Sequence, residues 1–395
     1  MNDTKAIADW LIDGARSAAN TQDMLAQFCD RLLGCGIPIW RVGLFIFTLH
    51  PQVMGQRVLW KPDAPVAVDN ASFEMFQSED FRRSPVRHVI DTGVALRRRL
   101  VEAVCPLDFA LTRDLKAQGV TDYFVVPLVF ADGVVHAASF ATQHPAGFAD
   151  RQIAGIEQLV APLTRVIESR MLKRTAIILL DTYVGNQAGA RVLAGHIRRG
   201  DTDVISAAIW LSDMRGFTRL ADRLPPQALT DLLNRYFDCQ VPAIQKHGGE
   251  ILKYMGDGLL AIFAIAAEGP DEHAVCHAAL AAAYETRTAV ATAFSTAEGL
   301  SDYGLNFGLA LHVGELLYGN IGSGNRLDFT YIGPAVNLAA RIEKLTGESQ
   351  RTILASHEFA RHFPSQFASI GEFALRGFGT ARPVFGLTDE AAPRA

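Results

Sequence analysis

The fold is decided by a stretch that reads Ile209-Trp-Leu-Ser-Asp-Met-Arg-Gly-Phe-Thr218, an apolar run that ends in a carboxylate, Asp213, and a small turn. A second stretch reads Glu250-Ile-Leu-Lys-Tyr-Met-Gly-Asp-Gly258, has Asp257 at its turn, and continues into the apolar run Leu259–Phe263. Each carboxylate therefore lies at the end of a predicted buried strand, where its side chain is held rigidly. A single aspartate at such a place often only caps a turn. Two together suit Mg²⁺, which takes one or two carboxylates and leaves its other positions to phosphate and water.

The composition is that of a soluble globular protein. At 395 residues, the chain has room for about two or three domains. It is 49% apolar and 20% charged, which is ordinary for a globular protein. The net charge of −5 argues against a nucleic-acid binder, which normally has a basic face. Any polyanionic ligand must therefore be met by local cations or by metal.

The cysteines and the apolar stretches indicate a cytoplasmic protein without a membrane span. The five cysteines include no Cys-x-x-Cys pair, so we expect reduced thiols and neither disulfides nor a zinc site. The longest apolar stretches, such as Leu259–Ala267, are far short of the roughly 20 residues that cross a bilayer. The first residues, Met1-Asn-Asp-Thr-Lys-Ala6, do not have the pattern of a signal peptide.

Residues 1–170 have the element pattern of an α+β domain. Apolar residues at helical spacing predict two helices near the start, and an Ala-Asp-Gly turn later joins two apolar runs into a hairpin. The predicted elements are helices within 1–35, strands over Trp40–Leu49, Tyr123–Phe130 and Val134–Thr142, and a helix over Asp150–Met171. The portion Val120–Glu168 resembles a GAF-type sensory domain, which implies a regulatory role. The sequence does not define a ligand pocket in it.

The helix predicted over Asp150–Met171 has two possible roles. Its apolar residues recur at alternating steps of three and four, as in a coiled coil: Ile153, Ile156, Val160, Leu163 and Ile167. Pro162 interrupts this pattern, which covers little more than two heptads. We expect the helix to pack against its own domain, and a parallel coiled coil in a dimer is the alternative.

Residues 171–203 are predicted to form a helical connector, and a second domain covers 204–390. In this domain strands and helices alternate, with one hairpin at its centre. The predicted elements are strand 204–212, helices to His247, the hairpin at Gly256-Asp-Gly258, an Ala-rich helix over 271–295, strand 306–312, helix Ala335–Leu345, and strands near 351–355 and 382–387. This order predicts an α/β sandwich of the ferredoxin-like type, with helices over one sheet.

A third polar motif reads Asp328-Phe-Thr-Tyr-Ile-Gly-Pro-Ala-Val-Asn-Leu-Ala-Ala-Arg341. Pro334 suits the first turn of a helix, where its missing N–H costs nothing. Asn337 and Arg341 are four residues apart and so share one helical face. An amide and a guanidinium side by side can orient a sugar and neutralise charge on a phosphate in its transition state. A solvated arginine beside a capping asparagine is the alternative for this segment taken alone.

Together, the three motifs resemble the class III nucleotide cyclases over about residues 200–390. The matching segments follow in the family's order and spacing: Trp210–Thr218, His247–Asp257 and Ile332–Arg341. A fourth segment, Leu311–Gly322, is similar to the bacterial branch of that family. The resemblance implies that Asp213 and Asp257 bind two Mg²⁺ or Mn²⁺ ions in each active site.

The resemblance also assigns roles to four further residues. Lys253 matches the residue that reads the purine ring, and it favours ATP because guanylate-specific members have Glu there. Thr330 stands at the other base-reading position, where many adenylate cyclases have Asp. Asn337 would position the ribose, and Arg341 would stabilise the pentavalent α-phosphate.

The remaining predicted substrate contacts are made to phosphate. Arg376 occupies the place of a triphosphate-binding Lys, and an arginine keeps the charge but changes the geometry. Three residues form the predicted turn into a helix after the first carboxylate: Gly216, Phe217 and Thr218. Backbone N–H groups at a helix start form an anion site, and glycine lets a phosphate come close.

The implied activity is the conversion of ATP to 3′,5′-cyclic AMP and pyrophosphate. In the family, one protomer supplies the metal carboxylates and the other supplies the Lys, Thr, Asn and Arg positions, so the implied partner is a second copy of the chain. A guanylate cyclase and a catalytically silent nucleotide-binding module are the alternatives. A diguanylate cyclase is suggested by Gly248-Gly-Glu250, but the signature of that family does not continue through Ile251 and Leu252.

Overall fold

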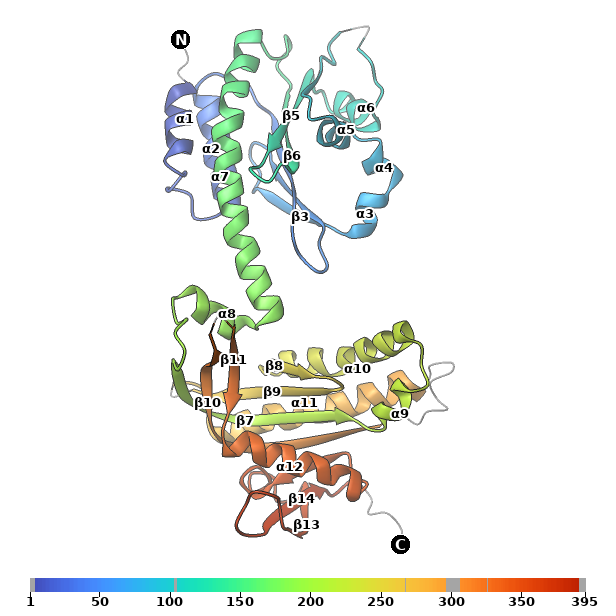
Figure 1. Ribbon diagram of the computed structural model, residues 1–395. Helices are drawn as coiled ribbons and strands as arrows, with labels where there is room; N and C mark the ends of the chain where they lie inside the picture. The colour runs from blue at the N-terminus through green and yellow to red at the C-terminus, as the bar shows by residue number, and fades with distance from the viewer. Residues whose placement is uncertain (1–3, 103–104, 267, 296–305, 325, 391–395) are drawn as a thin grey trace. The chain divides into compact units, whose positions relative to one another are not determined.

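The computed structural model describes residues 4–102, 105–266, 268–295, 306–324 and 326–390. The chain divides into two compact units, which are Met1–Leu179 (unit 1) and Leu180–Ala395 (unit 2). Both units combine helices with a sheet (Figure 1), so the prediction of a mixed α and β protein is confirmed. Within the described ranges, no helix has both the length and the apolar character that crossing a bilayer requires.

Unit 1 is built on a six-stranded antiparallel sheet in the order β3-β2-β1-β6-β5-β4. Its strands are β1 (Arg41–Phe47), β2 (Gly55–Trp60), β3 (Ala67–Ala71), β4 (Leu96–Arg98), β5 (Asp122–Val129) and β6 (Val135–Thr142). The predicted hairpin is the pair β5 and β6. The strands β2, β3 and β4 were not predicted, because β3 is exposed and β4 has only three residues.

Helices cover both faces of this sheet. One face packs against α1 (Thr4–Ile12), α2 (Thr21–Gly34) and α7 (Asp150–Tyr183), and the other against α5 (Pro85–Thr92) and α6 (Ala110–Ala117). Two short helices, α3 (Phe73–Gln77) and α4 (Glu79–Arg82), precede α5. Helix α2 begins where Asn20 accepts a hydrogen bond from the Asp23 N–H, as expected for an N-cap residue.

Helix α7 packs against the core of unit 1, as we expected. Ile153, Ile156, Leu163 and Ile167 are buried in that core. The helix passes through Pro162 and continues to Tyr183, beyond the predicted end at Met171. The first part of the predicted connector is therefore helical, and the last turn of α7 belongs to unit 2.

Unit 2 contains an eight-stranded mixed sheet in the order β13-β14-β12-β10-β7-β9-β8, with β11 paired to β10. The strands are β7 (Thr202–Met214), β8 (Glu250–Met255), β9 (Gly258–Ile265), β10 (Phe307–Ser323), β11 (Arg326–Ile332), β12 (Ile353–Ser356), β13 (Phe367–Phe373) and β14 (Arg382–Leu387). Strand β10 is parallel to β12 and antiparallel to β7. It is longer than the predicted strand 306–312, because it continues into a hairpin with β11.

Strand β7 is buried on both of its faces. Ala208 and Trp210 face the helices α10 (Pro226–Lys246) and α11 (Glu272–Ser295). The intervening Ala207 and Ile209 belong to the opposite core, together with residues of α8 (Asn186–Leu193) and α12 (Pro334–Glu348). This double burial explains why the sequence of β7 is apolar without alternation. Two short helices, α9 (Phe217–Ala221) and α13 (His357–Ala360), complete the unit.

Candidate active site

Two aspartates converge at one end of the central strands of unit 2. Asp213 is the penultimate residue of β7 and lies opposite Gly308 of β10. Asp257 lies in the two-residue turn between β8 and β9, which Met255 and Gly258 close. Because β9 pairs with β7, the turn and the end of β7 share one sheet edge. The two carboxyl groups are neighbours, because each affects the pKa of the other.

Glycines on both sides of Asp257 permit this approach. Gly256 has a φ of +71°, which the tight turn requires and an L side chain rarely adopts. A Cβ atom at Gly258 would lie 3.1 Å from Asp213 Oδ1 and 3.1 Å from the carbonyl oxygen of Ser212. A larger residue at position 258 would therefore displace the first carboxylate.

The two carboxyl groups are poorly solvated and repel each other. Burial raises the pKa of Asp213 to about 7, and the negative charges of Asp257 and Glu343 contribute to the rise. Burial also raises the pKa of Asp257. Among the described residues, neither aspartate has a basic partner that lowers its pKa. A half-buried pair of like charges is an environment that a divalent cation stabilises.

A third acid, Glu343 of α12, lies near this pair. Burial raises the pKa of Glu343, and the charge of Asp257 adds to the effect. The helix approaches β10 closely, because a Cβ atom at Gly308 would lie 2.7 Å from Glu343 Oε1. In the described part of the chain, however, no three His, Cys, Asp or Glu side chains are arranged to hold a metal ion. The donor set is thus two carboxylates, which suits Mg²⁺ with water and substrate oxygens as its other ligands.

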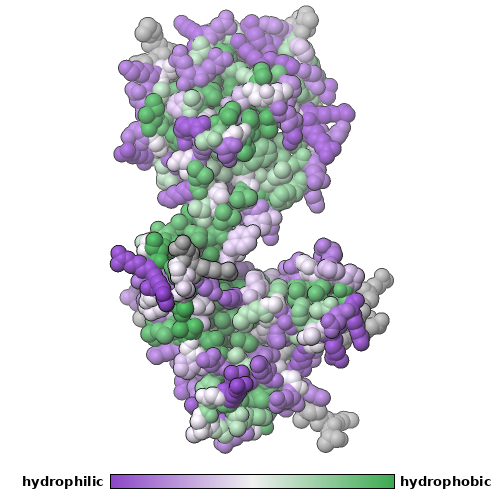
Figure 2. Space-filling view, viewed as in Figure 1, coloured by the Kyte–Doolittle hydropathy of each residue, from purple (hydrophilic) through white to green (hydrophobic). Residues whose placement is uncertain are grey.

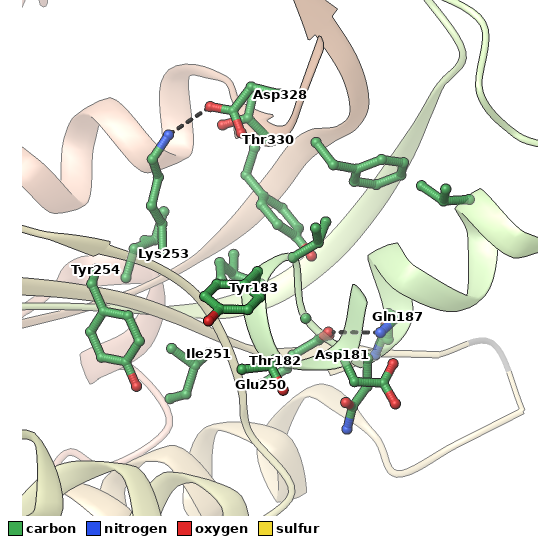
Figure 3. Close-up of a pocket in the computed structure, with 18 of the residues that line it drawn as sticks. Asp181, Thr182, Tyr183, Gln187, Glu250, Ile251, Lys253, Tyr254, Asp328 and Thr330 are labelled. Atoms are coloured by element: carbon green, nitrogen blue, oxygen red, sulfur yellow. Dashed lines mark hydrogen bonds and ion pairs between the residues drawn. The ribbon is translucent and has the colours of Figure 1, made fainter. Parts of the chain in front are cut away.

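A second group of predicted residues lines an open cavity of about 980 Å³ (Figure 3). Lys253 of β8 and Thr330 of β11 both belong to its wall. Lys253 follows a β-bulge, since the register of β8 shifts between Ile251 and Lys253. A bulge of this kind re-aims the side chain that follows it. Lys253 Nζ lies 2.6 Å from Oδ2 of Asp328, an ion pair that the sequence did not predict.

The end of α7 and the turn after it also line the cavity, with residues 181–187. Glu250 of β8 accepts a hydrogen bond of 3.2 Å from the Gln187 N–H, and its other carboxylate oxygen is buried without a partner. Helix α8 then packs on the β10–β11 hairpin, where Arg191 pairs with Asp203 and lies over the ring of Tyr318. The first residues of unit 2 are therefore in direct contact with the strands that carry Lys253 and Thr330.

Helix α12 begins with Pro334 at its first turn, as predicted. Asn337 is exposed and Arg341 is partly exposed, and they share one face. Glu343 lies two residues after Arg341 and so on a different face of α12. Among the described residues, no hydrogen bond or ion pair joins Asn337 or Arg341 to Asp213, Asp257 or Lys253. Within one copy of the chain, the described contacts therefore do not join these predicted residues into one cluster.

Comparison with known proteins identifies the fold of unit 2. Residues 202–385 match the family described as the adenylate and guanylate cyclase catalytic domain. This match supports a class III adenylate/guanylate cyclase catalytic domain over these residues of unit 2 (the cyclase domain). The chain is 28% identical to adenylate cyclase 1 of Rhizobium meliloti (strain 1021) over 44% of its own length and 26% of that protein. It is 30% identical to the adenylate cyclase of Anabaena cylindrica over 44% of its length and 34% of that protein.

The cyclase domain is also similar to solved structures. The crystal structure of the adenylyl cyclase CyaB from P. aeruginosa is 28% identical, covers 49% of this chain and all of its own chain, and has a TM-score of 0.43. The chain spans about a third or less of the length of the curated relatives named above.

The remaining predicted site residues of the cyclase domain lie at the start of α9 and in the connection between β13 and β14. Gly216 has a φ of +73° and precedes α9, so the predicted turn into a helix after Asp213 is present. Phe217 packs against the core beneath α10, and Thr218 is exposed. Arg376 is exposed in the connection between β13 and β14. No described contact joins Arg376 to either of the two groups above.

Sequence reasoning missed three parts of this site. Asp328 was quoted as the start of a motif but received no role, although a strand period of two would have placed it on the face of Thr330. Glu343 gave no signal, because an acid in an amphipathic helix is ordinary. No sequence pattern indicated that residues 181–187 line the cavity, because their position depends on how far α7 extends.

Proposed function

We propose that this chain is an adenylate cyclase that converts ATP to 3′,5′-cyclic AMP and pyrophosphate in a homodimer. The observation that carries the proposal is the convergence of Asp213 and Asp257 at one sheet edge of a domain that matches the cyclase family. Two relatives over this region are themselves named adenylate cyclases. The base-reading position Lys253 and the helix that carries Asn337 and Arg341 are both formed.

The aspartate pair fits two divalent cations, Mg²⁺ or Mn²⁺. The carboxyl groups are half-buried and adjacent, and no basic partner is found for them in the described ranges, so a cation would relieve their repulsion. When bound, such ions lower the cost of deprotonating the ribose 3′-hydroxyl and neutralise charge on the phosphates. Because Gly258 has no Cβ atom, it leaves room for the Asp213 carboxylate beside the turn that carries Asp257.

The other residues fold the nucleotide so that the 3′-oxygen attacks the α-phosphate in line with the departing pyrophosphate. Lys253 donates to a ring nitrogen of adenine from the cavity wall, and Thr330 lies beside it. Asn337 orients the ribose, and Arg341 neutralises charge that accumulates on the α-phosphate. Arg376 and the turn Gly216–Thr218 hold the remaining phosphates. Positioning of this kind supplies much of the rate, because the reaction is intramolecular.

We infer that a second copy completes the site, because no described contact within one copy joins Asn337 or Arg341 to the aspartate pair. Apolar side chains are also exposed along the strands that hold the cavity: Tyr254, Met255, Leu317, Leu327 and Ile332. Figure 2 shows hydrophobic, green side chains on the surface of unit 2 over the region of β10. Exposed apolar residues in one region are typical of a surface that another chain covers. A head-to-tail dimer would bring the helix α12 of one protomer to the aspartate pair of the other.

Unit 1 is proposed to regulate the cyclase domain as a GAF-like sensory domain. Its antiparallel sheet with helices on both faces supports this, as does the helix α7 that continues into unit 2.

A guanylate cyclase and a catalytically silent module are the alternatives to the proposed activity. The silent module is disfavoured because both aspartates, Asn337 and Arg341 are present.

The test is a nucleotide assay on the purified chain with Mg²⁺ or Mn²⁺. ATP should give cyclic AMP, GTP should compete weakly, and Asp213→Ala should abolish the product without unfolding the chain. Mixing Asp213→Ala protein with Arg341→Ala protein should restore part of the activity, because one of the two shared sites is then intact. No recovery despite demonstrated subunit exchange would rule out the shared site. The same assay on residues 180–395 reports whether unit 1 activates or represses.

A further inference from the structure

Arg215, two residues after Asp213, is fixed at both its backbone and its side chain, although the proposed reaction gives it no role. Its backbone N–H donates a 2.8 Å hydrogen bond to the carbonyl of Asn306, just before β10. Its partly buried side chain donates from Nη2 to two backbone carbonyls, that of Thr346 at 2.7 Å and that of Arg351. The first belongs to the last turn of α12 and the second follows that helix. A guanidinium suits this place, because the last carbonyls of a helix lack partners within it.

Glu343 brings the same helix close to the aspartate pair. Its Oε1 lies over Gly308, since a Cβ atom there would be 2.7 Å from that oxygen. Gly308 is the residue of β10 that pairs with Asp213. Burial raises the pKa of Glu343, the charge of Arg215 opposes the rise, and the charge of Asp257 adds to it. Helix α12 therefore places an acid beside the pair and is held by a guanidinium from the turn that follows the first acid.

The same helix carries Asn337 and Arg341, the residues proposed to act on the ribose and the α-phosphate. It packs beside β7 (Figure 1). Asn337 lies about 14 Å along the helix axis from Thr346, so a change at the anchored end passes along one rigid element. In the proposed head-to-tail dimer, Asn337 and Arg341 complete the partner's site, whereas the aspartate pair belongs to the protomer's own site. One helix therefore serves both active sites.

We propose that Arg215 and Glu343 link the two shared active sites of the dimer. Arg215 fastens α12 to the turn after Asp213, and Glu343 makes the docking of that helix depend on the charge of the aspartate pair. A cation on the pair turns repulsion of Glu343 into attraction, so α12 is held more firmly. Asn337 and Arg341 are then better fixed for the partner's site. Both linking residues are positioning residues, and the inference rests on the proposed function, since it needs the metal site and the dimer.

The experiment measures amide hydrogen exchange in α12 of the full chain, with and without Mn²⁺ and in the absence of nucleotide. Electron paramagnetic resonance reports the bound Mn²⁺ in the same samples. The variant is Arg215→Lys, and Arg351→Lys is the matched control. Arg351 also donates from one terminal nitrogen to two backbone carbonyls, those of Leu387 and Glu390 at 2.8 and 2.9 Å, and neither belongs to α12.

A second pair of variants tests the other linking residue and applies even if Arg215→Lys does not fold. Glu343→Gln keeps the shape of the side chain and removes its charge. Glu348→Gln is its control, because Glu348 is an exposed acid on the same helix. Thermal unfolding of each variant establishes that it is folded.

Mn²⁺ should slow exchange in α12 of the native chain by about fivefold or more, the lower end of the coupling between two sites. Arg215→Lys should reduce this slowing to less than about twofold, because an ammonium does not reproduce the planar guanidinium geometry. Glu343→Gln should reduce it equally, since α12 then no longer responds to charge on the pair. Both controls should keep the native slowing. Native slowing in folded Arg215→Lys or Glu343→Gln that still binds Mn²⁺ would overturn the inference.

A mixed dimer shows which copy of the helix responds. It joins a native protomer to an Asp213→Asn protomer that is labelled with a heavy nitrogen isotope, so the peptides of the two copies differ in mass. Only the native protomer has an intact aspartate pair, and the link predicts that Mn²⁺ slows exchange in that protomer's own α12. Slowing only in α12 of the Asp213→Asn protomer would be a direct effect across the dimer interface and would contradict the link.

The two hypotheses fail in different ways. If α12 responds to Mn²⁺ through Arg215 but no cyclic AMP forms, the proposed activity is wrong and the link between the two metal sites stands. If cyclic AMP forms but α12 does not respond, the activity stands and this inference is wrong. A chain that binds no Mn²⁺, or that stays monomeric, contradicts both.

Discussion

The two acidic groups of the cyclase domain differ in how their charge is balanced. Asp213 and Asp257 are half-buried and face each other, and burial raises the pKa of both. Asp328 is exposed and neutralised by Lys253 in the same chain. In the proposed metal site, a cation balances the first group, and its affinity would come from relief of repulsion. The second is already balanced, so a ligand could bind either side chain only by replacing its present partner.

The largest effect should follow from removing one acid of the unbalanced group. Asp213→Asn keeps the shape of the side chain but removes a metal ligand, and we expect turnover to fall by at least ~10³-fold. The melting temperature should stay the same or rise, because a repulsive contact is lost. Measurement of cyclic AMP formation and thermal unfolding on the same protein checks both. Near-native turnover would show that the aspartate pair is not the metal site.

The second-largest effect should come from a substitution that changes the separation of Asp213 and Asp257 and leaves both carboxylates in place. Gly258→Ala places a Cβ atom 3.1 Å from Asp213 Oδ1 and should displace that group by a fraction of an ångström. Misplacement on the order of 1 Å in a catalytic geometry can cost about 10²-fold in rate. Gly34→Ala is the control, since an added Cβ there meets no atom within 4 Å. Equal activity of the two variants would mean that the separation of the acids is not critical.

A smaller effect is expected on the stability of the folded chain when metal is added, and it should depend on the aspartate pair but not on Lys253. Mg²⁺ or Mn²⁺ at ten times its dissociation constant should stabilise the folded chain by about 1.4 kcal/mol, and a chelator should reverse this. Asp213→Asn should lose the metal-dependent rise in melting temperature, whereas Lys253→Ala should keep it. Calorimetry with and without metal makes the comparison. A shift that persists in Asp213→Asn would place the bound ion elsewhere.

The contrast also explains what could be predicted from the sequence. The places of Asp213 and Asp257 at strand ends follow from local patterns, because each acid ends an apolar strand and one lies in a Gly-Asp-Gly turn. Their convergence depends in addition on the pairing of β9 with β7. The helix that begins at Pro334 is likewise marked by residues within one turn of each other. No local sequence pattern predicts the pairing of Lys253 with Asp328. It depends on the β10–β11 hairpin, whose second strand mixes charged and apolar residues and was not recognised as a strand.

The same limit applies to unit 1 and to the connector. The hairpin of β5 and β6 was predicted from its turn, but β3 has no buried residue and so no apolar pattern to recognise. The extension of α7 to Tyr183 was missed because its last turns leave apolar residues such as Leu172 exposed. Elements that are stabilised by distant parts of the chain leave little trace in their own sequence.

The smallest expected effect concerns the stability contributed by the balanced group. Asp328→Ala should change the free energy of unfolding by less than ~1 kcal/mol, because the ion pair is exposed on both sides. High salt should reduce even that difference, since it screens exposed charges. Urea unfolding of the native chain and the variant at low and high salt measures it. A loss well above this value that salt does not change would mean that the pair is structural, and the contrast between an unbalanced and a balanced acidic group would then no longer hold.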